Sequence, residues 1–180
     1  PASWSGGSSD FGDLTGDYSA YCGGISNGTI AISAMGYKGS YVQDLDTITI
    51  SSTGNASDVG NATLAGTGPT GTSTLSRGIH SAGFAYYSGY YYFNQIGYIS
   101  MASPADSTDF GDLTDKSNDG GTSCPSTEAR IINRWGGWGM EGTSGTTAPS
   151  QLDYSNPTST ANSSDFGDQN VDRRGAASCT

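Results

Sequence analysis

The sequence has few of the features on which most enzymes and membrane proteins depend. It contains one histidine, His80, which leaves almost no room for a catalytic triad or a histidine-rich metal centre. No apolar run approaches the roughly 18 residues that a membrane-spanning helix needs. The chain has 7 basic against 17 acidic residues, and its net charge is -10. A nucleic-acid binder needs a basic surface, so we expect no nucleic-acid partner, no anionic membrane surface and no membrane span.

Helical periodicity is also scarce. Long segments lack apolar residues at positions i, i+3 and i+4, and the 28 glycines and many β-branched residues interrupt almost every window. Charged residues make up only 13% of the chain. Solubility must therefore come mainly from Ser, Thr, Asn and Gly, which is typical of β-rich extracellular or particle-surface proteins. The 11 tyrosines argue against disorder.

One tetrapeptide, Asp-Phe-Gly-Asp, organises the sequence. The chain has three intact copies and one degenerate copy, at Asp10–Asp13, Asp109–Asp112, Asp165–Asp168 and Asp58-Val59-Gly60-Asn61. They begin at residues 10, 58, 109 and 165, so the intervals are 48, 51 and 56 residues. Repeats of this period indicate a propeller, a solenoid or an array. We treat 1–180 as a single repeat domain with units 10–57, 58–108 and 109–164 and a partial unit 165–180.

Strand signals fill each unit. Residues Thr29–Met35 and Leu45–Ile50 alternate between apolar and small or polar side chains, as half-buried strands do. His80 is expected within an edge or core strand. Further strands are expected at 18–23, 78–86, 91–100, 121–124, 129–135, 152–154 and 175–179. The short spacing leaves no room for a helix, and the sequence predicts an all-β fold.

The tetrapeptide itself is expected to form an acidic turn. Each unit buries one face only by stacking on the next, so Phe11, Phe110 and Phe166 are predicted to be anchors between units. The aspartates are expected to accept backbone N–H bonds within their own turn. Calcium binding is the alternative, although the spacing does not match an EF-hand loop. The candidate calcium ligands of this alternative are Asp10, Asp13, Asp17, Asp109, Asp112 and Asp115. No other cofactor or metal is expected.

The three cysteines keep the same register. Cys22, Cys124 and Cys179 follow the first aspartates of their copies by 12, 15 and 14 residues, and they are interpreted as small buried residues on an inner strand. A Cys22–Cys124 bridge or a metal site is the alternative.

An aromatic run, Tyr86-Tyr87-Ser88-Gly89-Tyr90-Tyr91-Tyr92-Phe93, is the most distinctive feature outside the repeat. Together with two tryptophans it could form an exposed platform for sugars or for a partner protein. The alternative is a β-hairpin whose rings pack between sheets. The candidate binding residues are Tyr86, Tyr87, Tyr90, Tyr91, Tyr92, Trp135 and Trp138.

Several segments resemble known repeats. Trp135-Gly136-Gly137, Leu152-Asp153-Tyr154 and Arg174-Gly175-Ala176-Ala177 are similar to the kelch repeat, in which a Gly doublet, a Tyr, a Trp and often an Arg mark one propeller blade. The motif phenylalanines stand in the place of the kelch Trp. The chain more closely resembles kelch-like virion structural proteins of tailed bacteriophages, especially marine and cyanobacterial ones. That likeness is carried by Leu45–Ile50, by Ser52-Thr53-Gly54-Asn55-Ala56-Ser57 and by the tetrapeptides, whereas the Gly doublet is missing from the first two units.

The resemblance implies kelch-like β-propeller blades. Propellers typically have four to eight blades, so three units and a fragment cannot close a ring alone. We therefore expect an excerpt of a longer repeat protein, several associated copies, or an open array. The opening Pro1 is consistent with a processed product or an excerpt.

The same resemblance implies a non-enzymatic structural or adhesive component of a virion: a tail-fibre, decoration or receptor-binding protein. The expected location is the virion or the extracellular space, and the expected partners are other virion proteins, copies of the chain itself or a host-surface glycan. One alternative is a secreted lectin-like or calcium-dependent carbohydrate- or protein-binding module. Another is a kelch-type enzyme domain resembling sugar oxidases, which the lack of histidine ligands opposes. Asp-Phe-Gly without the other kinase motifs does not indicate a kinase, and the duplicated acids single out no glycosidase pair.

Overall fold

The computed structural model describes residues 7–16, 20–81, 83–117, 126–134, 151–168 and 170. Within these residues the protein is all-β, as the sequence predicts, with twelve strands and no helix. All strand pairs are antiparallel. No helix in the described part of the chain could therefore span a membrane.

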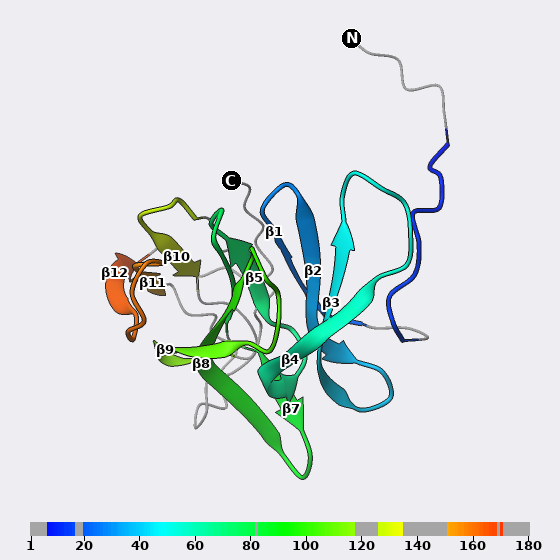
Figure 1. Cartoon of the computed structure of the whole chain (residues 1–180). Helices are drawn as coiled ribbons and strands as arrows, with labels where there is room; N and C mark the ends of the chain where they lie inside the picture. The colour runs from blue at the N-terminus through cyan, green and yellow to red at the C-terminus, as the bar shows by residue number, and fades with distance from the viewer. Residues whose placement is uncertain are drawn as a thin grey trace.

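The strands form three sheets that follow one another in chain order. Figure 1 shows them side by side, from blue and cyan through green to orange. Sheet 1 contains β1 (Gly23–Ser26), β2 (Ile30–Tyr37), β3 (Tyr41–Thr49) and β4 (Ser57–Gly66). Sheet 2 contains β5 (Thr70–Ser73), β6 (Arg77–Ser81), β7 (Phe84–Tyr86), β8 (Tyr90–Ser100) and β9 (Thr108–Ser117), with β7 and β9 both pairing with β8. Sheet 3 contains β10 (Ile131–Arg134), β11 (Gln151–Ser155) and β12 (Ser164–Asp168).

The last strand of each sheet carries a copy of the repeated tetrapeptide. The second, third and fourth copies lie in β4, β9 and β12, so the prediction that the motif forms a turn is wrong for them. In each case the register with the partner strand shifts beside the motif, as at a β-bulge. The motif glycines have positive φ angles of 138° at Gly60, 141° at Gly111 and 125° at Gly167. Gly and Asp favour turns and bulges alike, which is why the sequence did not separate the two.

Two apolar cores lie at the two junctions between sheets. The first joins sheets 1 and 2 and the second joins sheets 2 and 3. Their buried members are Ile25, Ile32, Ala34, Met35, Leu45, Ala62, Ile99 and Met101 in the first, and Ile79, Ile96, Phe110, Leu113 and Ile131 in the second. Each fully buried Ile or Leu contributes about 2 kcal/mol. The sheets therefore stabilise one another in sequence, and the described residues do not close into a ring.

Two of the expected strands differ from those in the structure. The single strand expected at 78–86 is divided, because Gly83 has a φ of 106° between β6 and β7. Of the strand expected at 18–23, residues 18 and 19 lie outside the described part. Tyr21 has a φ of 57° and interrupts the extended chain, and β1 begins at Gly23. The strands expected at 121–124 and 175–179 lie outside the described residues.

Candidate functional site

The repeated motif attaches each sheet to the next. In the first copy the Gly12 N–H donates to Asp10 Oδ1 at 3.1 Å, as expected for an aspartate that bonds within its own motif. The backbone of the copy then binds the loop before β4. The Asp13 N–H donates to Asn55 Oδ1 at 3.1 Å, and the Gly54 N–H donates to the Phe11 carbonyl at 2.8 Å. This segment, residues 7–16, is called the arm below.

The second and third copies make the corresponding contacts. The Asn61 N–H donates to Asp106 Oδ1 at 2.8 Å, and the Asp112 N–H donates to Asn162 Oδ1 at 3.0 Å. A Cβ on Gly111 would lie 2.5 Å from the Ala161 carbonyl carbon. Glycine is therefore required here for the close approach of two backbones as well as for its φ angle.

Buried carboxylates reinforce the outer two of these junctions. Asp153 is fully buried and accepts bonds from the Thr114 N–H at 2.9 Å and the Thr114 hydroxyl at 2.8 Å. The Ser163 hydroxyl donates to the same carboxylate at 3.3 Å. Asp46 of sheet 1 accepts the corresponding two bonds from Thr15 of the arm. Burying a carboxylate is tolerated because these donors replace water. The bonds indicate a structural role for both aspartates.

His80 is buried in sheet 2, as expected for a strand residue. Its Nε2 lies 3.1 Å from Ser107 Oγ, and burial lowers the pKa of His80 to about 4. Ser107 Oγ also accepts the Thr63 N–H at 2.9 Å. With its lowered pKa the imidazole is neutral at neutral pH, and it forms a hydrogen bond with Ser107 within the sheet.

The calcium candidates are not brought together. Asp10 and Asp109 lie in separate copies, and the Oδ1 atom of each accepts the N–H of its own motif glycine. Asp115 Oδ1 accepts the N–H of Lys116. In the part of the chain that the structure describes, no group of three or more His, Cys, Asp or Glu residues could hold a metal ion. Asp17 lies outside the described residues.

The three motif phenylalanines have different surroundings. Phe110 is 2% exposed within the core between sheets 2 and 3. Phe11 in the arm is 37% exposed and Phe166 in β12 is 49% exposed. Phe166 contacts Tyr154 edge-on at 6.1 Å, as Phe110 contacts Tyr98. The burial of each ring thus follows whether a further sheet packs beside it.

The interpretation of the cysteines as buried residues is wrong for Cys22. This side chain is exposed and forms no disulfide. It lines an open cavity on the outer face of sheet 1, where no other sheet of the described chain packs. Cys124 and Cys179 lie outside the described residues.

The aromatic run forms one side of a larger exposed cluster. The rings are linked in series: Tyr37 to Tyr41 at 5.3 Å, Tyr41 to Tyr87 at 5.8 Å and Tyr87 to Tyr91 at 5.9 Å. Tyr41 also contacts Phe84 at 6.5 Å. The β2–β3 hairpin of sheet 1 and the β7–β8 hairpin of sheet 2 therefore meet through aromatic rings. The aromatic patch is defined as Tyr37, Tyr41, Phe84, Tyr86, Tyr87 and Tyr91.

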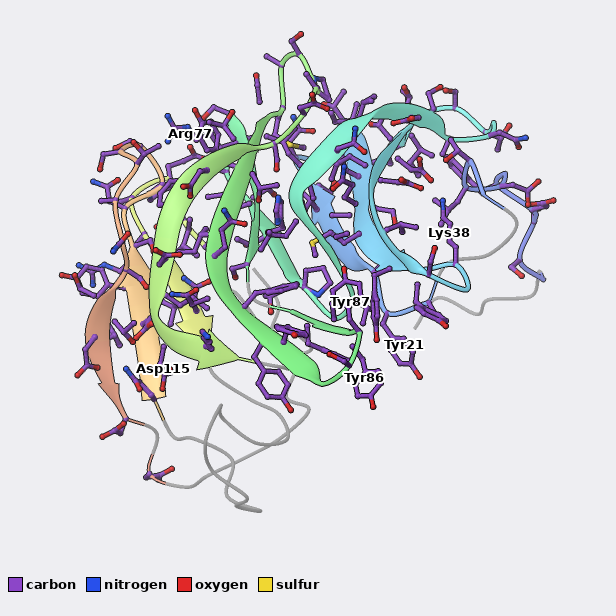
Figure 2. All side chains as sticks on the ribbon, turned by 90° about the horizontal axis from the view of Figure 1, so that it is seen from below. Tyr21, Lys38, Arg77, Tyr86, Tyr87 and Asp115 are labelled. Atoms are coloured by element: carbon purple, nitrogen blue, oxygen red, sulfur yellow. The ribbon has the colours of Figure 1, made fainter. Side chains whose placement is uncertain are left out.

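Much of the aromatic patch faces solvent. Tyr87 is 66% exposed, and Tyr86 and Tyr91 are about half exposed. Tyr21 adds a further exposed ring. Its carbonyl accepts the Gly68 N–H, and the neighbouring Thr67 forms a β-bridge with Phe84, so the backbone at Tyr21 is held close to β7. Figure 2 shows Tyr21, Tyr86 and Tyr87 at the same end of the molecule.

The other candidate binding residues are placed differently. Tyr92 is half-buried in β8. Tyr90 lies opposite Tyr86 at the end of the β7–β8 hairpin, but its side chain is outside the described part. Trp135 and Trp138 also lie outside the described residues.

Sequence reasoning missed the part of the patch that sheet 1 provides. The signal was present, because Tyr37 and Tyr41 flank a Lys-Gly turn much as Tyr87 and Tyr90 flank Ser-Gly. Lys38 in that turn forms an ion pair with Asp44 at 2.8 Å. The hydrogen bond to Asp44 raises the pKa of Lys38. The ammonium group of Lys38 is therefore held at Asp44 and beside Gly16 of the arm.

The described residues thus offer an exposed aromatic surface on a rigid frame. Comparison with the models of known protein families and with curated protein sequences finds no match for this chain.

Proposed function

We propose that this protein is a non-enzymatic structural and adhesive component of an extracellular particle, and that its aromatic patch binds a surface glycan. The observation that carries the proposal is the convergence of exposed tyrosines from two sheets on one surface. Exposed apolar rings that gather in one place mark interaction sites more often than scattered ones do.

The chemistry of the patch favours sugar rings. A tyrosine presents an apolar face, on which the C–H groups of a pyranose can stack, and a hydroxyl that forms hydrogen bonds. The net charge of -10 opposes acidic glycans. Neutral sugars are therefore the expected ligand class.

The scaffold suits a load-bearing role. Consecutive sheets are joined by the same hydrogen bond, from a motif backbone N–H to a side-chain oxygen of the next sheet. Repeat proteins build long surfaces from such repeated contacts. In our proposal the sheets are kelch-like propeller blades, as the sequence resemblance implies. The same resemblance supports a tailed-phage virion as the setting, in a tail fibre, a decoration protein or a receptor-binding protein.

Glycan-array binding tests the adhesive role. Tyr87→Ala and Tyr91→Ala should each remove most of the binding of a neutral glycan. Leu75→Ala is the matched control, because Leu75 is also a large exposed apolar residue but is not part of the patch. An array with no positive glycan, or equal losses in all three variants, would rule out the patch as a glycan site. Mass spectrometry of purified virions, with the protein absent from them, would oppose the proposed setting.

A further inference from the structure

Among the described residues, sheets 1 and 3 each have one face on which no other sheet packs, and sheet 2 shows what covers the corresponding faces. We name the face that points to the following sheet the C-side face, and the opposite one the N-side face. In sheet 2 both faces are buried: Ile79 and Ile96 on the C-side face pack with sheet 3, and Ile99 on the N-side face packs with sheet 1. In the described part of the chain, no other sheet packs on the N-side face of sheet 1, where the arm lies, or on the C-side face of sheet 3 (Figure 1).

The C-side face of sheet 3 carries apolar residues at the same register positions as that of sheet 2, but no sheet of the described chain packs on it. Ile132, Leu152 and Tyr154 occupy the register positions of Ile79, Ile96 and Tyr98, yet Ile132 and Leu152 are only half-buried. These two positions are almost fully buried in sheet 2. The half-exposed Phe166 likewise corresponds to the buried Phe110.

An arginine shows the same difference. Arg77 of sheet 2 lies over the Tyr98 ring at 4.5 Å and donates to the Pro157 carbonyl of sheet 3 at 2.8 Å. Arg130 holds the corresponding place in sheet 3 and lies over the Tyr154 ring at 5.0 Å. Arg130 is exposed. It is therefore aligned to donate to a further sheet.

The backbone of the fourth motif copy has the conformation with which the first three copies bind the loop before the last strand of a sheet. A Cβ on Gly12 would lie 2.2 Å from the Gly54 carbonyl oxygen, and Gly60 and Gly111 are equally crowded. A Cβ on Gly167 would meet nothing within 4 Å. Gly167 nevertheless keeps the positive φ angle of the others, 125°. The backbone is in the binding conformation, and no loop of the described chain lies against it.

The N-side face of sheet 1 corresponds to the faces of sheets 2 and 3 on which the preceding sheet packs. It holds an open cavity of about 460 Å³, whose lining includes Leu14, Cys22, Ala31 and Ile48. Ile48 and Ala31 correspond in register to Ile99 of sheet 2 and Ile131 of sheet 3, which are both buried between sheets. This cavity lies where a preceding sheet would pack.

We propose that two molecules of this chain associate head to tail, with the C-side face of sheet 3 in one on the N-side face of sheet 1 in the other. The arm now holds part of that site through Asp10–Asp13. The fourth copy has the same four residues, so it can replace the arm and make the same bonds to Gly54 and Asn55. Asn170 then takes the position of Thr15 beside Asp46.

The exchange favours association because sheet 3 covers more than the arm does. The arm has no strand partner among the described residues, whereas the incoming motif belongs to a sheet and brings Tyr154 and Phe166 against the cavity. The contact joins two different faces, so it yields a ring if it closes and a filament if it does not. Two molecules supply six sheets, within the usual four to eight of a closed propeller. The inference does not depend on glycan binding.

Sedimentation velocity on the whole chain over a concentration series tests this contact, with a pair of glycine variants matched in backbone strain. Gly12→Ala makes the arm clash with Gly54, so it should release the arm and tighten association. Gly167→Ala has space within one molecule but would clash with Gly54 of the second. It should weaken association by at least about tenfold, the change that a loss of about 1.4 kcal/mol produces. Thermal unfolding checks that each variant is folded.

Phe166→Ser serves as a second variant, in case Gly167→Ala disturbs β12, and it should also weaken association. Association of the unmodified chain, or of Gly12→Ala alone, supports the proposal when both sheet 3 variants reduce it. A chain that stays monomeric even as Gly12→Ala overturns it. Association that neither Gly167→Ala nor Phe166→Ser changes overturns it as well, because the contact then uses another face.

Discussion

The imidazole ring of His80 fills the space beside Gly97 in which the other two sheets place an aspartate. Asp46 and Asp153 occupy the register position of Gly97. A Cβ on Gly97 would lie 2.4 Å from the His80 ring. Ser107 bonds to this ring as Ser163 bonds to Asp153. The second unit has therefore exchanged a buried charge for a buried neutral ring while keeping the hydroxyl partner.

This exchange predicts that stability depends on the protonation of His80. Burial lowers its pKa to about 4, against an ordinary value of 6.5, so the unfolded chain binds more protons between these values. Stability should therefore fall as the pH drops from about 6.5 to about 4, by about 3 kcal/mol in all. Urea unfolding of His80→Gln, whose side chain does not titrate, should lack this loss. Parallel stability curves for the two proteins over that pH range would contradict the assignment.

The buried carboxylate of Asp153 should be important for stability. Asp153→Ala removes the acceptor of the Thr114 N–H and hydroxyl, whereas the Ser163 hydroxyl keeps the Asp112 carbonyl at 3.1 Å. A hydrogen bond to a charged group contributes about 1.5 to 3 kcal/mol. We expect a loss of about 2 kcal/mol in denaturant unfolding. Asp115→Ala removes an exposed carboxylate from the same region and should change stability by less than about 0.5 kcal/mol. Equal effects of the two substitutions on the free energy of unfolding would show that the hydrogen bonds to Asp153 add no more stability than an exposed carboxylate does.

Local patterns in the sequence predicted the strands, while long-range packing decided the rest. The β-branched and apolar residues of Leu45–Ile50 identify β3, although Leu45 and Ile48 lie on opposite faces of the sheet. The exposure of Cys22 could not be predicted, because it depends on whether another sheet packs there. The same is true of Phe166, whose sequence neighbours match those of Phe110.

The binding surface was predicted only in part. The tyrosine run between Tyr86 and Tyr91 was found because it is local. Its contact with Tyr41, which in turn contacts Tyr37, joins two sheets, and no short window of the sequence contains both halves of the patch. The αL conformation of Tyr21 could not be predicted either, because non-glycine residues rarely adopt it.

Chelation should leave the repeat intact. The first aspartate of every motif copy accepts the N–H of its own glycine, at 2.7 to 3.1 Å, so the motif needs no cation to fix it. We expect the same thermal midpoint with EDTA and with added calcium. A midpoint that falls sharply in EDTA would instead show that the motif aspartates or Asp17 bind calcium.

Phe11, Phe110 and Phe166 occupy the same position of the motif but differ in burial, so their substitution separates the effect of burial from that of the motif. Phe110→Ala creates a cavity between sheets 2 and 3, and such changes cost about 3 to 5 kcal/mol. Phe11→Ala and Phe166→Ala remove rings that are already 37% and 49% exposed, so each should cost less than about 1.5 kcal/mol in dilute solution. Denaturant unfolding of the three variants measures the difference. A similar loss in all three would mean that the motif stabilises each unit from within, and that a neighbouring sheet adds little to the stability that the ring provides.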